Sequence, residues 1–228
     1  MPIAPALLLL ADARFPTGGH AHSAGTEQAV AIGDVHDVDS LGRYLRARLA
    51  TTGRTDAAFT AFTCRVMSDR NRPAGPVLAA TDREYSARVP SPYLREASRR
   101  LGRQLVRAAS RAWPSAALAE VAAVPGGPHQ PIALGAAAAS AGAEPDDAAV
   151  LALHHLAGAV ATAGVRLLGL DPIEVAAMQA DATSDASHTL ADRPWLVDDP
   201  ALLPASGGLL TEILGEHHGS LDARLFVA

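Results

Sequence analysis

Two histidines near the N-terminus are the residues whose types and spacing best fit metal chemistry. His20 and His22 form an H-x-H sequence directly after Gly19. In an extended backbone, alternate residues face the same way, so both imidazoles would reach one metal ion. Two ligands are too few for a structural site, and the sequence names no third. We therefore favour local hydrogen bonding of these rings, with a metal site at His20 and His22 as the weaker hypothesis.

A row of arginines is the second group of residues that could have a function, here as a binding surface. Arg95, Arg99, Arg103, Arg107 and Arg111 recur every four residues within one expected helix. Four residues overshoot a helical turn by about 40°, so the row winds partly around the helix. Two interpretations remain open. The row is either a basic surface for an acidic partner or a solvated helix face in a chain whose basic residues are all arginine.

Composition excludes several classes of chemistry. The chain has 19 arginines and no lysine, which rules out a Walker-A lysine, a Schiff-base lysine and a pyridoxal-phosphate anchor. Its one cysteine, Cys64, rules out an intrachain disulfide and a zinc site built on several thiolates. A net charge of −5 argues against a dedicated nucleic-acid binder. No catalytic motif is recognisable either, so we predict no catalytic residue and no cofactor.

The elements that must position these residues are expected to be helices. The chain has 228 residues, of which 49% are apolar, 4% are aromatic and 50 are alanine, a bias that favours helix over strand. We therefore predict an all-α, single-domain bundle of roughly nine or ten helices over residues 1–228. The expected helices cover about residues 5–12, 23–32, 40–52, 56–67, 77–88, 92–113, 115–124, 132–141 and 145–168, one from 172 and a tail at 209–228.

Local signals set the expected ends and faces of these helices. Ser23 is the expected N-cap of the second helix, and Asp39 or Ser40 that of the third. Gly53 is expected to interrupt the helical run, which restarts at Asp56. Ser91 is the expected cap of the long arginine-bearing helix, whose inner face would carry Leu94, Leu101, Leu105 and Ala108.

The long apolar helix at 145–168 should lie in the centre of the bundle. Its uncharged stretch at 148–165 is rich in Ala and Gly and contains His154 and His155, which favours a buried core helix over a membrane span. A secretory signal is also lacking, since no basic residue precedes the apolar run at 7–10. We expect a soluble, cytoplasmic protein with no membrane partner.

Motifs at both ends of the chain resemble those of the UreF family of urease accessory proteins. The N-terminal motifs are Leu9-Leu10-Ala11-Asp12, Phe15-Pro16-Thr17-Gly18-Gly19 and His22-Ser23-x-Gly25-x-Glu27. The C-terminal motif is His218, Leu221 and then Arg224-Leu225-Phe226. Arg95-Glu96-Ala97-Ser98 and the stretch from Val165 to Leu170 are similar to interior segments of the family. The chain departs from the family pattern at His20, Thr26, Gly169-Leu170-Asp171, Gly215 and Gly219.

The resemblance implies a non-catalytic chaperone for metal-centre assembly. UreF proteins are all-α and form dimers, bind UreD (also called UreH) and recruit the GTPase UreG. The assembly delivers nickel to the urease apoprotein, with GTP hydrolysis on UreG coupled to metal release. On this basis the partner-binding residues would be Gly18, Gly19, His22, Ser23, Gly25, Glu27, Arg95, Arg99, His218, Leu221, Arg224, Leu225 and Phe226.

Particular roles follow from the same resemblance. Gly18 and Gly19 would let the backbone turn sharply. Glu27, about one turn into its helix, would either stabilise the helix dipole or present its charge to the GTPase, and we favour the second. The tail at 209–228 would be a partner-docking element, in which Arg224 offers a bidentate fork and Leu225 and Phe226 offer apolar anchors. Gly215 and Gly219 would weaken its helix. The apolar end would then either fold back on the bundle or be ordered by a partner, and the resemblance favours the partner UreD.

Two other functions remain open. One is a helical enzyme that binds a small molecule, which would show a deep apolar cavity with converging carboxylates. The other is a direct nickel carrier that uses His20, His22 and further histidines.

Overall fold

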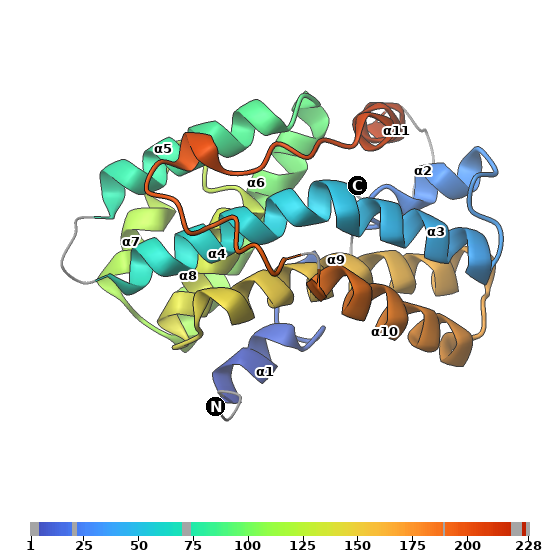
Figure 1. The fold of residues 1–228 in the computed structure, drawn as a ribbon, viewed down its shortest axis with the longest axis horizontal. Helices are drawn as coiled ribbons and strands as arrows, with labels where there is room; N and C mark the ends of the chain where they lie inside the picture. Colours follow the sequence, from blue (N-terminus) through green and yellow to red (C-terminus); the bar gives the residue numbers. More distant parts are fainter. Residues whose placement is uncertain (1–4, 20–21, 70–73, 189, 220–224, 227–228) are drawn as a thin grey trace.

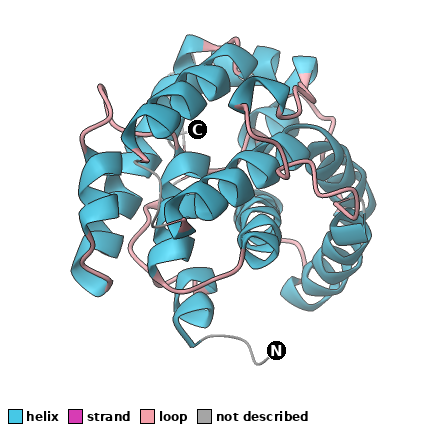
Figure 2. Ribbon diagram, turned by 60° about the vertical axis from the view of Figure 1, so that its left-hand side comes forward, coloured by secondary structure: helices cyan, strands magenta, loops and turns pink. Residues whose placement is uncertain are grey.

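Helices joined by loops make up the part of the chain that the structure describes (Figures 1 and 2). The computed structural model describes residues 5–19, 22–69, 74–188, 190–219 and 225–226, apart from the side chains of residues 218 and 219. The elements in chain order are α1 (Pro5–Ala11), α2 (Thr26–Ala31), α3 (Val38–Arg48), the π-helical turn η2 (Leu49–Gly53), α4 (Arg54–Ser68), α5 (Gly75–Arg88), α6 (Pro92–Ala112), α7 (Ala116–Ala122), α8 (Gln130–Ser140), α9 (Pro145–Leu168), α10 (Pro172–His188), the 3-10 turn η3 (Pro200–Leu202) and α11 (Leu209–Gly219). The predicted all-α fold is confirmed.

Three helices form the centre of the bundle. α4 lies against both α8 and α9, and α8 also lies against α6. In Figure 1, α5 and α7 lie towards one end of α4, whereas α2, α3 and α10 lie towards the other. Gly135 in α8 shows how closely the central helices approach, because a Cβ atom at this position would lie 2.2 Å from the carbonyl oxygen of Thr60 in α4. Small residues therefore let these backbones pack directly against each other.

The helix α9 lies in the interior, as predicted, and begins and ends at the predicted residues Pro145 and Leu168. It packs against α2, α3, α4, α8 and α10. A Cβ atom at Gly164 would lie 2.4 Å from the Leu41 side chain of α3. Among the described residues, α9 is the one helix long and apolar enough to cross a membrane, but 56% of that stretch is buried inside the bundle. Burial in the protein core thus accounts for its composition.

The expected break at Gly53 is wrong. The chain passes from α3 through η2 into α4 without leaving a helical conformation, and Gly53 has ordinary right-handed backbone angles. A Cβ atom there would lie 3.0 Å from the Leu156 side chain, so this glycine serves close packing against α9. If α3, η2 and α4 are counted as one rod, the described residues contain ten α-helices, close to the expected number.

The expected cap of α3 also differs from the structure. α3 is capped by Asp37, not by Asp39 or Ser40. The Asp37 carboxylate accepts a hydrogen bond from the Ser40 amide at 2.8 Å, and the Ser40 hydroxyl lies 3.0 Å from the Asp37 amide. This reciprocal pair is a capping box, which places the first turn two residues earlier than the sequence suggested. By contrast, Ser91 caps α6 as predicted, because its hydroxyl accepts from the Leu94 amide at 3.0 Å.

The inner face of α6 is rotated from the predicted one. A Cβ atom at Gly102 would lie 2.0 Å from the carbonyl oxygen of Pro128, so the connection before α8 crosses the helix at this position. Gly102 therefore lies on the buried face of α6, whereas Leu94, Leu101 and Ala108 are only half-buried. The residues of α6 that are buried are Ala97, Gly102, Leu105, Val106 and Ala109, of which Leu105 alone was predicted.

The helix α11 is attached to the start of α6 by two carboxylates. Glu212 accepts a hydrogen bond from the Ser91 amide at 2.7 Å, and Glu216 accepts one from the Tyr93 amide at 3.1 Å. Both acids therefore satisfy N–H groups at the positive end of the α6 dipole. Gly215 lies inside α11 and does not interrupt it, contrary to expectation. A Cβ atom there would lie 2.6 Å from Leu94, so the glycine allows α11 to lie directly on α6.

Candidate functional site

The loop between α1 and α2 carries most of the N-terminal candidate residues. Gly18 and Gly25 both have a positive φ, of 78° and 80°, which favours glycine. Gly18 is also tightly enclosed, because a Cβ atom there would lie 1.8 Å from the side-chain oxygen of Gln104 in α6. The predicted sharp turn is therefore confirmed at Gly18. Gly19, by contrast, does not adopt a positive φ.

The start of α2 differs from its prediction. The N-cap position is held by Gly25, and α2 begins at Thr26, so Ser23 lies too early to be the cap. Ser23 is nevertheless fully buried, and its hydroxyl oxygen lies 3.4 Å from the Glu27 amide as a hydrogen-bond acceptor. Glu27 thus occupies the first turn of α2, where a carboxylate faces the positive end of the helix dipole.

Glu27 joins the two ends of the chain. One of its carboxylate oxygens accepts a hydrogen bond from the Leu225 amide at 2.6 Å, and the other accepts one from the Phe226 amide at 3.1 Å. The Phe226 ring is 3% exposed, and the Arg166 guanidinium of α9 lies 4.6 Å from its centroid. Motifs 198 residues apart in the sequence therefore meet in space. We call the group of Ser23, Glu27, Arg166, Leu225 and Phe226 the terminal junction.

The junction corrects the expected state of the tail. Phe226 is buried against this chain's own residues instead of standing free as an apolar anchor, whereas Leu225 is 53% exposed. The Glu27 carboxylate is engaged with the C-terminal backbone instead of being free to meet a GTPase. His218 lies in the last turn of α11, and Leu221 and Arg224 are outside the described residues.

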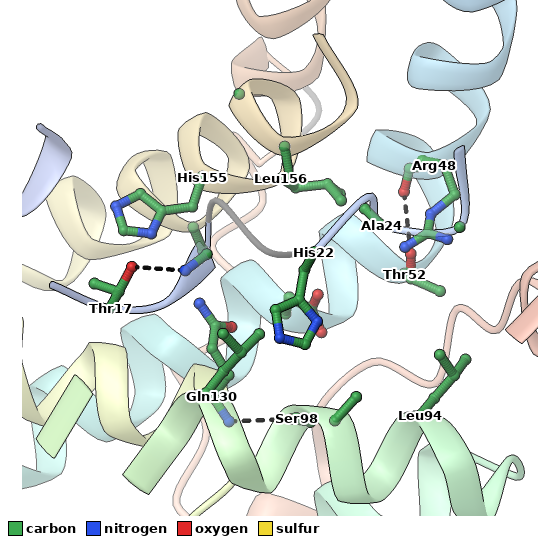
Figure 3. A pocket seen from close by; sticks show the side chains of 18 of the residues that line it. Thr17, His22, Ala24, Arg48, Thr52, Leu94, Ser98, Gln130, His155 and Leu156 are labelled. Atoms are coloured by element: carbon green, nitrogen blue, oxygen red, sulfur yellow. Dashed lines mark hydrogen bonds between the residues drawn. The ribbon is translucent and has the colours of Figure 1, made fainter. Parts of the chain in front are cut away.

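A cavity of about 370 Å³ lies beside the α1–α2 loop (Figure 3). Its walls come from this loop, from the end of α1 and from α3, η2, α4, α5, α6, α8, α9 and α11. His22, which is 9% exposed, points into it between the His155 side of α9 and the Leu94 side of α6 (Figure 3). His20, its predicted partner in metal binding, lies outside the described residues. The described part of the chain contains no group of three or more His, Cys, Asp or Glu side chains placed to hold a metal ion.

The cavity wall includes an unusual carboxyl group. The Tyr85 hydroxyl donates to the Asp56 carboxylate at 2.6 Å. Burial raises the pKa of Asp56 to about 6, although the Tyr85 hydrogen bond and the nearby Arg48 favour the charged form. Burial also raises the pKa of Glu212, which lines the same cavity. Asp56 was predicted only as the start of a helix, and its apolar neighbours Ala57 and Ala58 were the signal that its carboxyl group would lie against the core.

The neighbouring histidines of α9 have a structural role. The ring nitrogen Nε2 of His155 lies 2.9 Å from the carbonyl oxygen of Leu10. The ring nitrogen Nε2 of His154 lies 3.3 Å from the carbonyl oxygen of Ala11. Burial lowers the pKa of His155 to about 4, which keeps the ring neutral near pH 7. The pair thereby ties the end of α1 to α9.

The arginine row divides between inward and outward positions. Arg95 donates to the carbonyl oxygens of Val89 and Pro90, both at 2.7 Å. Arg99 donates to the buried Asp82 carboxylate at 2.9 Å, and only 19% of its side chain is exposed. These two predicted partner-binding residues therefore hold the connection into α6 and join α6 to α5. Their contact with a partner stays a prediction.

The chain is similar to a known protein family and to several relatives of the same name. A model of the UreF family matches residues 35–183. The chain is 37% identical over 226 residues to the urease accessory protein UreF of Mycobacterium sp. (strain JLS), covering 97% of each chain. It is 38% identical over 224 residues to that of Mycolicibacterium vanbaalenii, again covering 97% of each. For that of Mycobacterium tuberculosis (strain H37Rv), identity is 37% over 169 residues, with 74% of this chain and 75% of the relative covered.

Proposed function

Because the chain belongs to the UreF family of urease accessory proteins, we propose that it is a non-catalytic adaptor in urease assembly. It binds UreD (UreH) and the GTPase UreG, and it supports GTP-dependent insertion of nickel into the urease apoprotein. Nickel is the cargo of the assembly, and the chain itself carries no cofactor. It acts in the cytoplasm as a homodimer, without a nucleic-acid or membrane partner.

The terminal junction is the observation that carries this proposal. The motifs that resemble the family most specifically come from opposite ends of the chain, and Glu27 joins them through two backbone hydrogen bonds. Residues that serve only the core need not bring both chain ends together. A docking surface made of both ends requires them to lie together, because a partner binds best to one defined arrangement of the two segments.

The residues of the junction then have two kinds of role. Glu27, Phe226 and Arg166 are positioning residues, because they hold the C-terminal segment through a carboxylate, a buried ring and a cation over that ring. Leu225 is 53% exposed and faces solvent from the held segment. Leu225 is therefore the side chain of the junction that is best placed to enter a pocket on UreD or UreG.

The experiment is co-purification of the full-length chain with UreD and UreG, followed by nickel analysis of urease. Leu225→Asp places a charge on the proposed contact and should abolish co-purification and leave urease without nickel. Leu202→Asp is the matched control, since Leu202 is 70% exposed in η3 and lies outside the junction. Both variants should melt like the parent protein.

Each result decides a different point. If the parent chain binds neither UreD nor UreG, the adaptor function is wrong. If Leu225→Asp binds and supports urease as well as Leu202→Asp does, the junction is not the docking surface. Sedimentation of the partner complex should show two copies of the 23.4 kDa chain, and a stable single copy would contradict the homodimer.

The nickel-carrier alternative has its own test. Equilibrium dialysis of the isolated protein should show only weak nickel binding, and His20→Ala with His22→Ala should leave the fold intact. Tight one-to-one binding that this double variant abolishes would favour the carrier. The cavity beside His22 provides a place for the small-molecule alternative, but family membership favours the adaptor.

A further inference from the structure

The outward side of α6 carries three arginines that the fold does not use. Arg100, Arg107 and Arg111 are exposed, and within the described residues they take part in no hydrogen bond or ion pair. Arg103, which lies between them in the sequence, is different. It donates to Glu96 at 2.9 Å and to the carbonyl oxygen of Gly126 at 2.6 Å. The three unused cations are therefore a distinct set, which we call the outer arginine stripe.

The three residues lie on one narrow strip of the helix surface. At about 100° per residue, positions 100, 107 and 111 fall within about 40° of one another, and they span about 16 Å along the axis. The C-terminal end of α6 is the negative end of the helix dipole. It therefore stabilises the charge of Arg111 in the last turn but not that of Arg100 in the middle of the helix. Like charges at positions 107 and 111 repel each other. The folded chain alone thus gives no reason for the stripe.

Composition gives no reason for it either. The chain has 24 acidic residues against 19 basic ones, so carboxylates are available to neutralise every arginine. Ion pairs are formed elsewhere, for example between Arg99 and Asp82 and between Arg103 and Glu96 on this same helix. Arg43 and Arg83 are also exposed, but they lie on separate helices, so the alignment of three such cations on one helix is a local feature of this surface.

The stripe lies next to the N-terminal loop. Gln104, which is on the same exposed side of α6, encloses Gly18. Further along the helix, the ring of Phe15 stacks on Trp113 with centroids 5.7 Å apart. The α1–α2 loop therefore runs along α6, and the stripe is continuous with a loop that leads into the terminal junction.

We propose that the outer arginine stripe docks an acidic protein segment whose carboxylates are spaced one to two helical turns apart. Each guanidinium offers a planar pair of N–H donors that matches a carboxylate, and three of them in line match a helix or extended segment with repeated Asp or Glu. The net charge of −5 repels a long polyanion, which favours a protein segment over nucleic acid. This inference rests on the proposed function, since the segment would belong to UreD, UreG or the urease apoprotein.

The test compares two charge reversals in the full-length chain. Arg107→Glu with Arg111→Glu alters the stripe. Arg43→Glu with Arg83→Glu is the control, because both residues are exposed on α3 and α5 and the net charge changes by the same amount. Binding of each purified partner is measured at low and physiological salt, together with a melting curve and with binding to a DNA duplex.

The stripe variant should weaken binding of one partner at least about tenfold, and the salt dependence of that binding should fall, whereas the control should change it less than about twofold. The same partner should regain affinity for the stripe variant when its own acidic segment is changed to lysines. Equal effects of both variants would overturn the proposal, as would loss of binding that follows a lowered melting temperature. If the parent chain binds DNA and the stripe variant does not, the ligand of the stripe is a nucleic acid and the proposal of an acidic protein segment is wrong. If no partner binds the parent chain at all, the proposed function fails as well.

Discussion

The centre of the bundle and the terminal junction are held together in different ways. In the centre, α4, α8 and α9 pack through small apolar residues, and contacts such as Gly135 against Thr60 leave no room for a methyl group. At the junction, one carboxylate, one buried ring and one cation hold a short segment that lies far away in the sequence. The centre depends on close packing of whole helices, whereas the junction depends on a few contacts of a short segment, so we expect the junction to open locally while the bundle stays folded.

Two matched aromatic truncations give the largest expected difference between these regions. Phe59 in α4 is fully buried, and Phe59→Ala should lower the free energy of unfolding by about 3–5 kcal/mol, because it leaves a cavity in the centre. Phe226 is almost as buried, but Phe226→Ala should cost about 2 kcal/mol or less, because the terminal segment can detach on its own. Urea unfolding of both variants measures the difference.

The same pair separates stability from binding. Phe226→Ala should lose UreD in co-purification although its melting curve changes little, and Phe59→Ala should retain binding at temperatures where it is folded. If Phe226→Ala destabilises the whole protein as much as Phe59→Ala does, the C-terminal segment belongs to the core and the distinction between the regions is wrong.

A pH titration probes the cavity wall, to which the central helices α4 and α9 contribute. Burial raises the pKa of Asp56 from its ordinary value of 3.8 to about 6 in the folded protein. The folded chain therefore holds the Asp56 proton more tightly than the unfolded chain does. Between about pH 4 and pH 6 the free energy of unfolding should fall as pH rises, by up to about 3 kcal/mol, and it should stay low above pH 6.

Asp56→Asn should remove this part of the pH dependence, since the amide carries no charge to bury. The measurement is urea unfolding of the parent chain and the variant at several pH values, and the difference between them isolates Asp56 from Glu212, whose pKa is raised by the same cause. A difference that does not change with pH would show that Asp56 is not buried as described.

Local signals in the sequence predicted much of the fold. Pro145 and the glycine after Leu168 fixed the ends of α9, and Ser91 fixed the start of α6, because each acts within one helical turn. The predicted break at Gly53 was wrong, because this glycine allows Leu156 of α9 to approach closely. That contact depends on a helix about one hundred residues away in the sequence. Long-range packing of this kind leaves no local pattern.

The site was less predictable for the same reason. Glu27 and Phe226 were identified as candidates by resemblance, but only the folded chain shows that they serve each other. The spacing of the arginine row showed that it winds around α6. Which arginines turn inward depended on where the connection before α8 crosses the helix, at Gly102. Arg166 lies within the stretch from Val165 to Leu170, and nothing local indicated that its guanidinium would lie over the ring of Phe226 near the C-terminus.

The central claim is that Glu27 acts by holding the C-terminal segment for a partner. The most direct test measures the affinity of UreD for four proteins, namely the parent chain, Glu27→Gln, a chain that lacks residues 225–228, and the combination of both changes. Glu27→Gln places an amide donor against a backbone N–H and should weaken binding about tenfold, or about 1.4 kcal/mol. In the shortened chain the same substitution should have no further effect, because the segment that Glu27 holds is gone. An equal loss in both backgrounds would show that Glu27 meets the partner itself, and no loss in either would remove the junction from the docking surface.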